Sequence, residues 1–382
     1  MLQLRSRRNR DGWRLRLGAV SLAAFALVFV GCGGEKSSER GGDTVASQAD
    51  SQGSAGAQLS GAKRFLGQHT DRLVGFTGEF KGLATRYHEL AAAESFDLER
   101  LWGRRADHVE PLLRQMKAAW VEGNPYYERV EGIVAGTPSL AEYDVILDAG
   151  SSASEDPQSA VPFDLTLPDG TVLKQPGNLY NLTEGALWGT LPAELRRAGA
   201  PADLDGDGAR EFGEVLPDPG LLLAASESFH EYAKELENAG EAWEPTPSDA
   251  FTAIVVMVPT MSEYFGQWKV SRFVAGEAAS AEAFNVVSRL SDIRDILTGL
   301  EVIYEGVEPA IARIDKEQAA QTGQELAGLR AFIAQLHARE QAGKRFAPEQ
   351  ADTLGSEAQE RATAIAGQVS QAAAQLGVEI AQ

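Results

Sequence analysis

The feature that most constrains the fold of this chain is an apolar stripe with helical spacing, which returns along most of its length. In the segment SDIRDILTGLEVIYEGVEP, residues 291–309, apolar side chains recur every three or four positions. This spacing is the 3.6-residue period of an α-helix that buries one face. Ser291 or Asp292 can cap the start of the helix, and Pro309 stands where it can stop. The apolar positions are Ile293, Ile296, Leu297, Leu300, Tyr304 and Val307.

Similar stripes predict helices over most of the chain after residue 60. In GQELAGLRAFIAQLHARE the stripe is Leu326, Leu329, Ile333 and Leu336, and the other predicted helices cover residues 62–92, 98–121, 221–238, 250–266 and 350–377. The segment PFDLTLPDGTVLKQPGN breaks this pattern, and its turn Pro168-Asp169-Gly170 between short apolar runs predicts a small β-hairpin. Strands and helices do not alternate, so we expect no parallel sheet. The predicted fold class is all-α with a loop-rich middle.

The start of the chain has the pattern of an export signal. A basic cluster, RSRRNRDGWRLR, precedes the apolar run of residues 17–30, which is shorter than the roughly 20 residues of a membrane-spanning helix. Cys32 is the only cysteine among 382 residues and follows FVG, which resembles a lipobox with Phe29 in place of the usual leucine. We therefore predict a lipoprotein signal peptide over residues 1–31 and lipidation of Cys32. The alternative is an ordinary secretory signal beside an unrelated cysteine.

The composition after the signal predicts a tethered, acidic protein of the cell envelope. Residues 32–60 are rich in Gly, Ser, Ala and Gln, which indicates a flexible tether. A folded part would then cover residues 61–382. Gly33 after the cysteine favours the outer membrane, on its periplasmic face. The net charge of −20 disfavours nucleic acid as a partner, because a phosphate backbone requires a basic surface. It favours cations and basic partners.

The segment DLDGDGAREFGE, residues 203–214, has the residue types of a twelve-residue calcium loop. Such a loop places oxygen ligands at positions 1, 3, 5, 7, 9 and 12 and glycine at position 6, here Gly208. We expect LPAELRRAG to form the incoming helix. No second loop follows, so the predicted calcium has a structural role; the alternative is an acidic turn that binds nothing specific. The predicted calcium ligands are Asp203, Asp205, Asp207, the backbone carbonyl of Ala209, Glu211 and Glu214.

Three segments resemble the imelysin-like family, in particular the periplasmic lipoproteins of ferrous-iron uptake. YYERVEGIVAGTPSLAEYDVILDAG is similar to a family segment in which a Tyr-Glu-Arg-Ile-Glu core precedes paired aspartates. PGNLYNL resembles a Pro-Gly-Asp-Leu-Ala-Asn turn, with Asn178 in place of the aspartate, and SDIRDILTGLEVIY resembles a late acidic helix. The resemblance implies two pseudo-related helical bundles with a cleft, an iron-binding role and a transport partner in the envelope. The site residues that it implies are Glu128, Glu131, Asp144, Asp148, Asp292, Asp295 and Glu301.

The chain also departs from the family pattern. The family has a Gly-x-His-x-x-Glu helix after the paired aspartates, but no histidine lies between Asp148 and Pro176. At a second position where the family has a histidine, this chain has Leu290. Any site would therefore consist mostly of carboxylates, which are harder and less selective ligands. His337 and Glu340 are expected to form a surface pair, and for His230 the expected setting is a solvated helix face.

The sequence predicts a binding protein and no enzyme. It has no Gly-x-Ser-x-Gly elbow, phosphate loop or His-Glu-x-x-His helix. The first hypothesis is a lipid-anchored imelysin-like protein that binds metal, with iron capture or delivery as its role. The second is a binding or scaffolding lipoprotein that lost the iron site and uses calcium structurally. A peptidase is the third.

Overall fold

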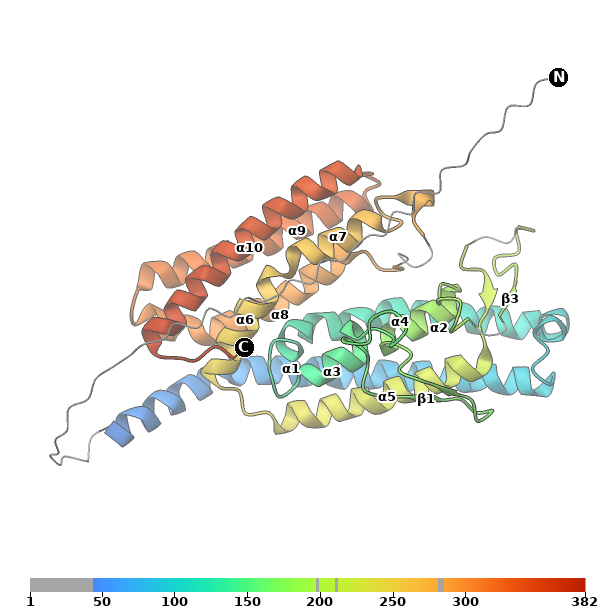
Figure 1. The fold of residues 1–382 in the computed structure, drawn as a ribbon, viewed down its shortest axis with the longest axis horizontal. Coiled ribbons are helices and arrows are strands. Elements are labelled where there is room, and N and C mark those ends of the chain that lie inside the picture. Colours follow the sequence, from blue (N-terminus) through green and yellow to red (C-terminus); the bar gives the residue numbers. More distant parts are fainter. Residues whose placement is uncertain (1–43, 197–198, 210–211, 281–284, 382) are drawn as a thin grey trace, which may run out of the picture. The chain divides into compact units, whose positions relative to one another are not determined.

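A computed structural model describes residues 44–196, 199–209, 212–280 and 285–381 of the protein. These residues are mainly helical, as predicted (Figure 1). The predicted signal peptide and the lipidation site Cys32 lie outside the described residues. In the described part of the chain, no helix combines the length and the apolar character needed to cross a membrane.

The first two helices form a long hairpin. Helix α1, Thr44–Ala93, and helix α2, Leu98–Val134, are joined by a tight turn in which Ser95 and Phe96 have positive φ angles of 57° and 59°. Asp97 caps α2, because its side chain accepts the backbone N–H of Arg100 at 2.9 Å. The structure differs from the predicted tether, since residues 44–60 belong to α1. Ala and Gln are good helix formers, so a polar composition alone does not exclude a helix.

Short elements fill the middle of the chain. Helix α3, Ala141–Asp144, continues directly into a π-helical turn, η1, Val145–Ala149. The predicted hairpin is confirmed: β1, Leu165–Thr166, pairs antiparallel with β2, Val172–Leu173. Helix α4, Leu179–Trp188, follows. A second two-stranded pair, β3, Ala200–Pro201, and β4, Val215–Leu216, closes the acidic loop.

The second half of the chain is almost entirely helical. Helix α5 covers Pro219–Ala242, α6 covers Pro247–Met257, and a 3₁₀ turn, η2, Val258–Thr260, leads into α7, Met261–Val270. A 3₁₀ turn, η3, Gly276–Ala278, precedes α8, Arg289–Ala312. Helices α9, Lys316–Gln341, and α10, Pro348–Leu376, complete the chain. Helix α8 continues past Pro309, where a stop was expected; a kink or stop at proline is a tendency, and this one lies within the last turn.

The predicted apolar stripes form the core. Every stripe residue of α8, from Ile293 to Val307, is at most 3% exposed, and the stripe of α9 is buried as well. Helix α8 packs against α2 and α9, while α10 packs against α6, α7 and α9 (Figure 1). Helix α1 contacts α5 through Phe76 and Phe229, whose ring centres are 5.9 Å apart.

Two glycines allow α2 and α8 to approach closely. A Cβ atom at Gly299 would lie 2.2 Å from the carbonyl oxygen of Arg129, and one at Gly132 would lie 2.8 Å from Leu300 Cγ. Asn124 at an earlier turn of α2 donates to Asp292 at an earlier turn of α8, so the two helices run in the same direction. This contact brings the acidic residues of both helices into one region.

Candidate metal centre

Helix α2 supplies two buried carboxylates. Glu128 and Glu131 are three residues apart, so they lie on the same side of the helix. They are only 2% and 4% exposed. The sequence predicted α2 only as far as Val121, but the helix continues to Val134 and carries both residues. Pro125 lies inside this helix and does not end it.

The α3–η1 segment supplies two aspartates. Asp144 is buried and accepts a hydrogen bond from the Tyr127 hydroxyl at 2.7 Å. Asp148 is partly buried on the π-helical turn. Asn178 holds the end of this turn, because its side-chain amide donates to the carbonyl oxygens of Asp148 and of Gly150, the latter at 3.0 Å.

The same side chain of Asn178 caps helix α4. Its Oδ1 accepts the backbone N–H of Asn181 at 2.8 Å. The PGN turn seen in the sequence therefore fixes the acidic turn and the start of α4 at once. The side-chain amide of Asn178 can make both kinds of hydrogen bond because it donates and accepts, whereas an ionised aspartate can only accept.

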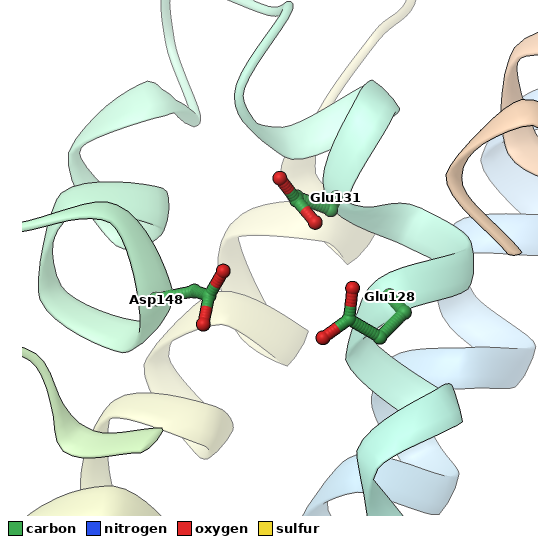
Figure 2. Close-up of side chains that lie close together, drawn as sticks. All are labelled: Glu128, Glu131 and Asp148. Atoms are coloured by element: carbon green, nitrogen blue, oxygen red, sulfur yellow. The ribbon is translucent and has the colours of Figure 1, made fainter. Parts of the chain in front are cut away.

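Three of these carboxylates converge. Glu128, Glu131 and Asp148 each offer one oxygen, and the three oxygens lie within 4.8 Å of one another. Figure 2 shows the three side chains pointing toward a shared space. Oε2 of Glu128 and Oε2 of Glu131 are both buried without a hydrogen-bond partner. Buried polar atoms are normally paired, so both oxygens are free to accept a ligand.

The start of α8 adds a fourth acid and a cation. Asp292 is 2% exposed, accepts from Asn124 at 3.3 Å and forms an ion pair with Arg289 at 3.0 Å. Burial lowers the pKa of Arg289, but Asp292 and Asp148 more than offset this, and the pKa lies above its ordinary value. Arg289 therefore remains a fixed positive charge beside the cluster.

Two residues that the resemblance implied lie outside this cluster. Asp295 is paired with Arg294 at 3.1 Å and with Arg129 at 3.7 Å. Glu301 is paired with Arg330 at 2.6 Å. Both carboxylates therefore already have cationic partners, which include Arg129 on α2 for Asp295 and Arg330 on α9 for Glu301. The structure brings Glu128, Glu131, Asp144, Asp148 and Asp292 together, and not these two.

Burial makes the clustered carboxyl groups hold their protons. It raises the pKa of Glu128 and of Glu131 well above their usual range, and Asp292 and Asp148 respectively add to the effect by like-charge repulsion. Burial, with the Asp148 charge, raises the pKa of Asp144 to about 7. It raises that of Asp292 to about 6. The cluster without a metal ion is therefore poised between protonated and charged forms near neutral pH.

Two cavities adjoin the cluster. A small one of about 20 Å³ is lined by Glu128, Asp148 and Asp292. A cleft of about 680 Å³ is lined by Glu131, Asp144 and Asp148. Asp148 borders both, so it connects the buried carboxylates to the cleft. Sequence reasoning did not single out several other lining residues, although one of them, Tyr180, lies in the PGNLYNL segment; the others include Glu184, Tyr264 and Arg289.

Of these residues, Tyr264 contacts the cluster directly and Glu184 lines both cavities. The Tyr264 hydroxyl on α7 donates to Glu131. Glu184 on α4 accepts the backbone N–H of Val286 at 2.5 Å. Burial raises the pKa of Glu184 to about 7. The sequence signal that could have identified Glu184 is a single glutamate in the otherwise mostly apolar helix LYNLTEGALW. In the structure this glutamate is 6% exposed.

The predicted calcium loop forms a second acidic group. Asp203, Asp205 and Asp207 place one oxygen each within 4.8 Å of one another. Asp203 accepts the backbone N–H groups of Gly206 and Gly208 at 2.7 and 2.9 Å. Gly208 has the positive φ, 88°, that the predicted sharp turn requires.

The flanks of this loop differ from the prediction. The expected incoming helix LPAELRRAG is absent from its described residues, and strands β3 and β4 frame the loop instead. Gly199 and Pro201 disfavour a helix that runs into the loop. Oε1 of Glu214 accepts the backbone N–H groups of Leu204 and Asp205 at 2.9 and 3.1 Å. Ala209 is exposed and donates its N–H to Asp207 at 2.7 Å, whereas Glu211 lies outside the described residues.

The histidines do not join either acidic group. The predicted surface pair of His337 and Glu340 is wrong: His337 is 7% exposed, and Glu340 accepts from the indole of Trp268 at 2.6 Å. This face of α9 packs inward, where Nδ1 of His337 lies 3.3 Å from the Arg294 guanidinium of α8. His230 is partly buried between α5 and α1, with Nδ1 3.1 Å from the hydroxyl of Thr77, so its predicted solvated face is also wrong.

Comparison with known proteins decides the family. The family model described as imelysin, which also carries a peptidase label, matches residues 85–372, well over half of the chain. The chain belongs to the imelysin family. The resemblance predicted from the sequence is thereby confirmed, and membership suggests a metal- or iron-related periplasmic protein. No curated protein matches this imelysin.

The residues of this imelysin fit a cation. The unpartnered oxygens of Glu128 and Glu131, next to Asp148, provide anionic ligands at short mutual distance. No histidine or cysteine lines either cavity in the part of the chain that the structure describes. Oxygen ligands suit hard cations better than soft ones. The arrangement can therefore hold a hard metal ion through its own carboxylates.

Proposed function

We propose that this imelysin is a cell-envelope lipoprotein that binds metal ions, as a periplasmic binding component of the iron-uptake type. The observation that supports it best is the pair of buried, unpartnered carboxylate oxygens of Glu128 and Glu131 beside Asp148. A carboxylate without a partner in the protein interior is destabilising by several kcal/mol. A bound cation compensates for this cost, which gives the protein a reason to keep three acids in one place.

The cleft supports capture and release. A cavity of about 680 Å³ leads to Asp148, so an ion can reach the cluster without unfolding of the protein. Binding requires deprotonated carboxylates, and the raised pKa values make the affinity depend on pH. The function proposed is therefore reversible binding and not catalysis. We also propose that the helices form the two pseudo-related bundles of the family, with α8 between α2 and α9.

The proposal includes a lipid anchor at Cys32 and a transport partner in the envelope. Its support is the basic cluster, the short apolar run and the lone cysteine of the sequence. Mass spectrometry of the mature chain tests the anchor directly. An N-terminal Cys32 with attached acyl chains is expected, and a Cys32→Ser variant is expected to lose them. A mature chain that begins elsewhere and carries no acyl group contradicts the anchor.

Metal analysis of the full chain, purified in detergent without added metal, tests the binding role. We expect bound iron at about one ion per chain, lost when Glu131→Gln and Asp148→Asn are combined. Glu263→Gln is the matched control, because Glu263 lines the same cleft but is exposed. Iron retention by the double variant equal to that of the wild type would contradict the proposed site.

A second candidate is a scaffolding lipoprotein that binds calcium for order and no iron. The grouping of Asp203, Asp205 and Asp207 around a loop with Gly208 in the required turn supports it. Iron retention no better than that of a calcium-loaded control would decide for this candidate.

A further inference from the structure

The hydroxyl of Tyr180 is the one buried tyrosine hydroxyl in the described part of the chain that lacks a hydrogen-bond partner. The other buried tyrosines all have one. Tyr87 donates to the carbonyl oxygen of Pro217 at 2.9 Å, Tyr127 donates to Asp144, and Tyr304 donates to the carbonyl oxygen of Ala319 at 2.6 Å. Buried tyrosine hydroxyls normally find a partner, so the exception at Tyr180 requires an explanation.

Aromatic neighbours fix the position of this hydroxyl. The Tyr180 ring packs edge-on against Trp120 and Phe229, with ring centres 5.7 and 4.7 Å away. The Tyr127 ring lies 5.7 Å away on another side. Because the ring is only 3% exposed and held on several sides, it cannot swing out to find water. The hydroxyl is therefore preorganised toward whatever occupies the space next to it.

That space is the small cavity of the candidate metal centre. Tyr180 lines it together with Glu128, Asp148 and Asp292. About 20 Å³ is enough for one water molecule or one ion. Tyr180 and Glu128, each with an unpartnered side-chain oxygen, thus line the same cavity, and one occupant that both oxygens contact would satisfy both.

We propose that Oη of Tyr180 is a direct ligand of the metal and that the ion is ferric iron, bound by the Tyr180 phenolate together with Glu128, Glu131 and Asp148. This inference rests on the proposed function. When the ion binds, the phenol O–H bond breaks and an iron–oxygen bond forms. The proton leaves to solvent through the cleft, and iron remains Fe(III), so no electron donor or acceptor is involved.

The charge of the ion decides between a phenol and a phenolate. A cation beside a phenol favours loss of the phenol proton, and a trivalent ion does so more strongly than a divalent one. A phenolate is also a hard oxygen donor, which suits a site without histidine or cysteine ligands. Divalent ions are expected to leave the phenol protonated.

Optical and Raman spectra of the full chain in detergent test the proposal, with ferric nitrilotriacetate as the iron source. Phenolate coordination to Fe(III) produces a visible charge-transfer band and enhanced phenolate vibrations in the Raman spectrum. We expect this band at one iron per chain in the wild type and its loss in Tyr180→Phe, with about 10- to 100-fold weaker ferric binding. The phenylalanine keeps the ring and its packing.

Two matched variants assign the band. Tyr87→Phe and Tyr304→Phe remove buried hydroxyls that bond the carbonyl oxygens of Pro217 and Ala319, and both are expected to keep the band because neither residue lines the two cavities. A band that survives in Tyr180→Phe, or ferric iron bound by the wild type with no phenolate vibration, would overturn the inference and leave the metal-binding function standing. No iron retained by the wild type would instead overturn the proposed function. The wild-type Raman spectrum gives an answer that does not depend on whether a variant folds.

Discussion

Replacing Glu184 by glutamine should stabilise the metal-free protein while weakening its hold on metal. Glu184 is buried on α4 and lines both cavities, and burial raises its pKa from 4.5 to about 7. Glutamine has the same shape, and its side-chain oxygen can still accept the backbone N–H of Val286. The substitution therefore removes a buried charge and retains the hydrogen bond.

The size of the effect follows from the pKa shift. A shift of one pKa unit corresponds to about 1.4 kcal/mol, so a rise from 4.5 to about 7 corresponds to about 3 kcal/mol. Because the folded-state pKa is raised, the stability of the wild type is highest below pH 4.5 and is lost as the pH rises toward 7. Glu184→Gln should not suffer this loss. We expect the variant to be more stable by up to about 3 kcal/mol at pH 8 and unchanged near pH 4, which is a melting-temperature gain of about 4–5 °C for a chain of this length.

Calorimetry in the presence of a chelator measures this difference at pH 4, 6 and 8. Glu263→Gln is the matched control, since Glu263 lies exposed on the same cleft and should show no change. With metal added, the order should reverse, because binding stabilises only the folded state and the wild type binds more tightly. A metal-free Glu184→Gln protein that is less stable than the wild type at pH 8 would refute the reasoning about buried charge.

Three further predictions concern the cluster, its support and the acidic loop. The melting temperature of the metal-free wild type should fall as the pH rises from 4 to 7. The raised pKa values of Asp144 and Asp292 mean that the folded state still holds protons that the unfolded chain has released. Calorimetry with saturating metal should show a flatter dependence of melting temperature on pH. Asn178→Ala should lower the free energy of unfolding by about 2 kcal/mol and weaken metal binding about 10- to 100-fold in titration calorimetry, because it frees the acidic turn. Asp97→Ala, at the cap of α2, should lower the free energy of unfolding by about 1 kcal/mol and leave metal binding unchanged. Chelation of calcium should lower the melting temperature, and Glu214→Ala should reproduce the loss while the exposed control Glu305→Ala does not; no change in either case would mean that the loop is only a turn.

Helical periodicity allowed most of the fold to be predicted from the sequence. The stripe from Ile293 to Val307 marks a face that is buried, and the Pro168–Gly170 turn identifies the hairpin. Where the prediction failed, tertiary packing overrode a local signal. Pro125 lies within α2, beyond the predicted helix end at Val121, and Pro309 lies within the last turn of α8, where a stop was predicted. Similarly, the sequence pattern places His337 on the surface, but the packing of α9 against α8 buries it.

The candidate site was only half predictable. The acids of α2 and of the α3–η1 segment were found through a resemblance, and the structure groups them. The same resemblance implied Asp295 and Glu301, which instead pair with arginines, since sequence spacing does not give the direction of a side chain. Tyr180 and Glu184 were missed because each is a single residue in an apolar helix, and only the fold shows that they face the acids.

The unequal burial of the three converging carboxylates has a kinetic consequence. Glu128 and Glu131 are both buried, with Glu131 at the edge of the cleft, whereas Asp148 is only partly buried there. An arriving ion would exchange its first hydration water for Asp148 and only later lose the rest to the two glutamates. Departure would follow the reverse order, so residence time would be governed mainly by the inner pair and capture rate by a single outer side chain. Affinity and speed could thus be altered separately, by changes at different residues of one small site.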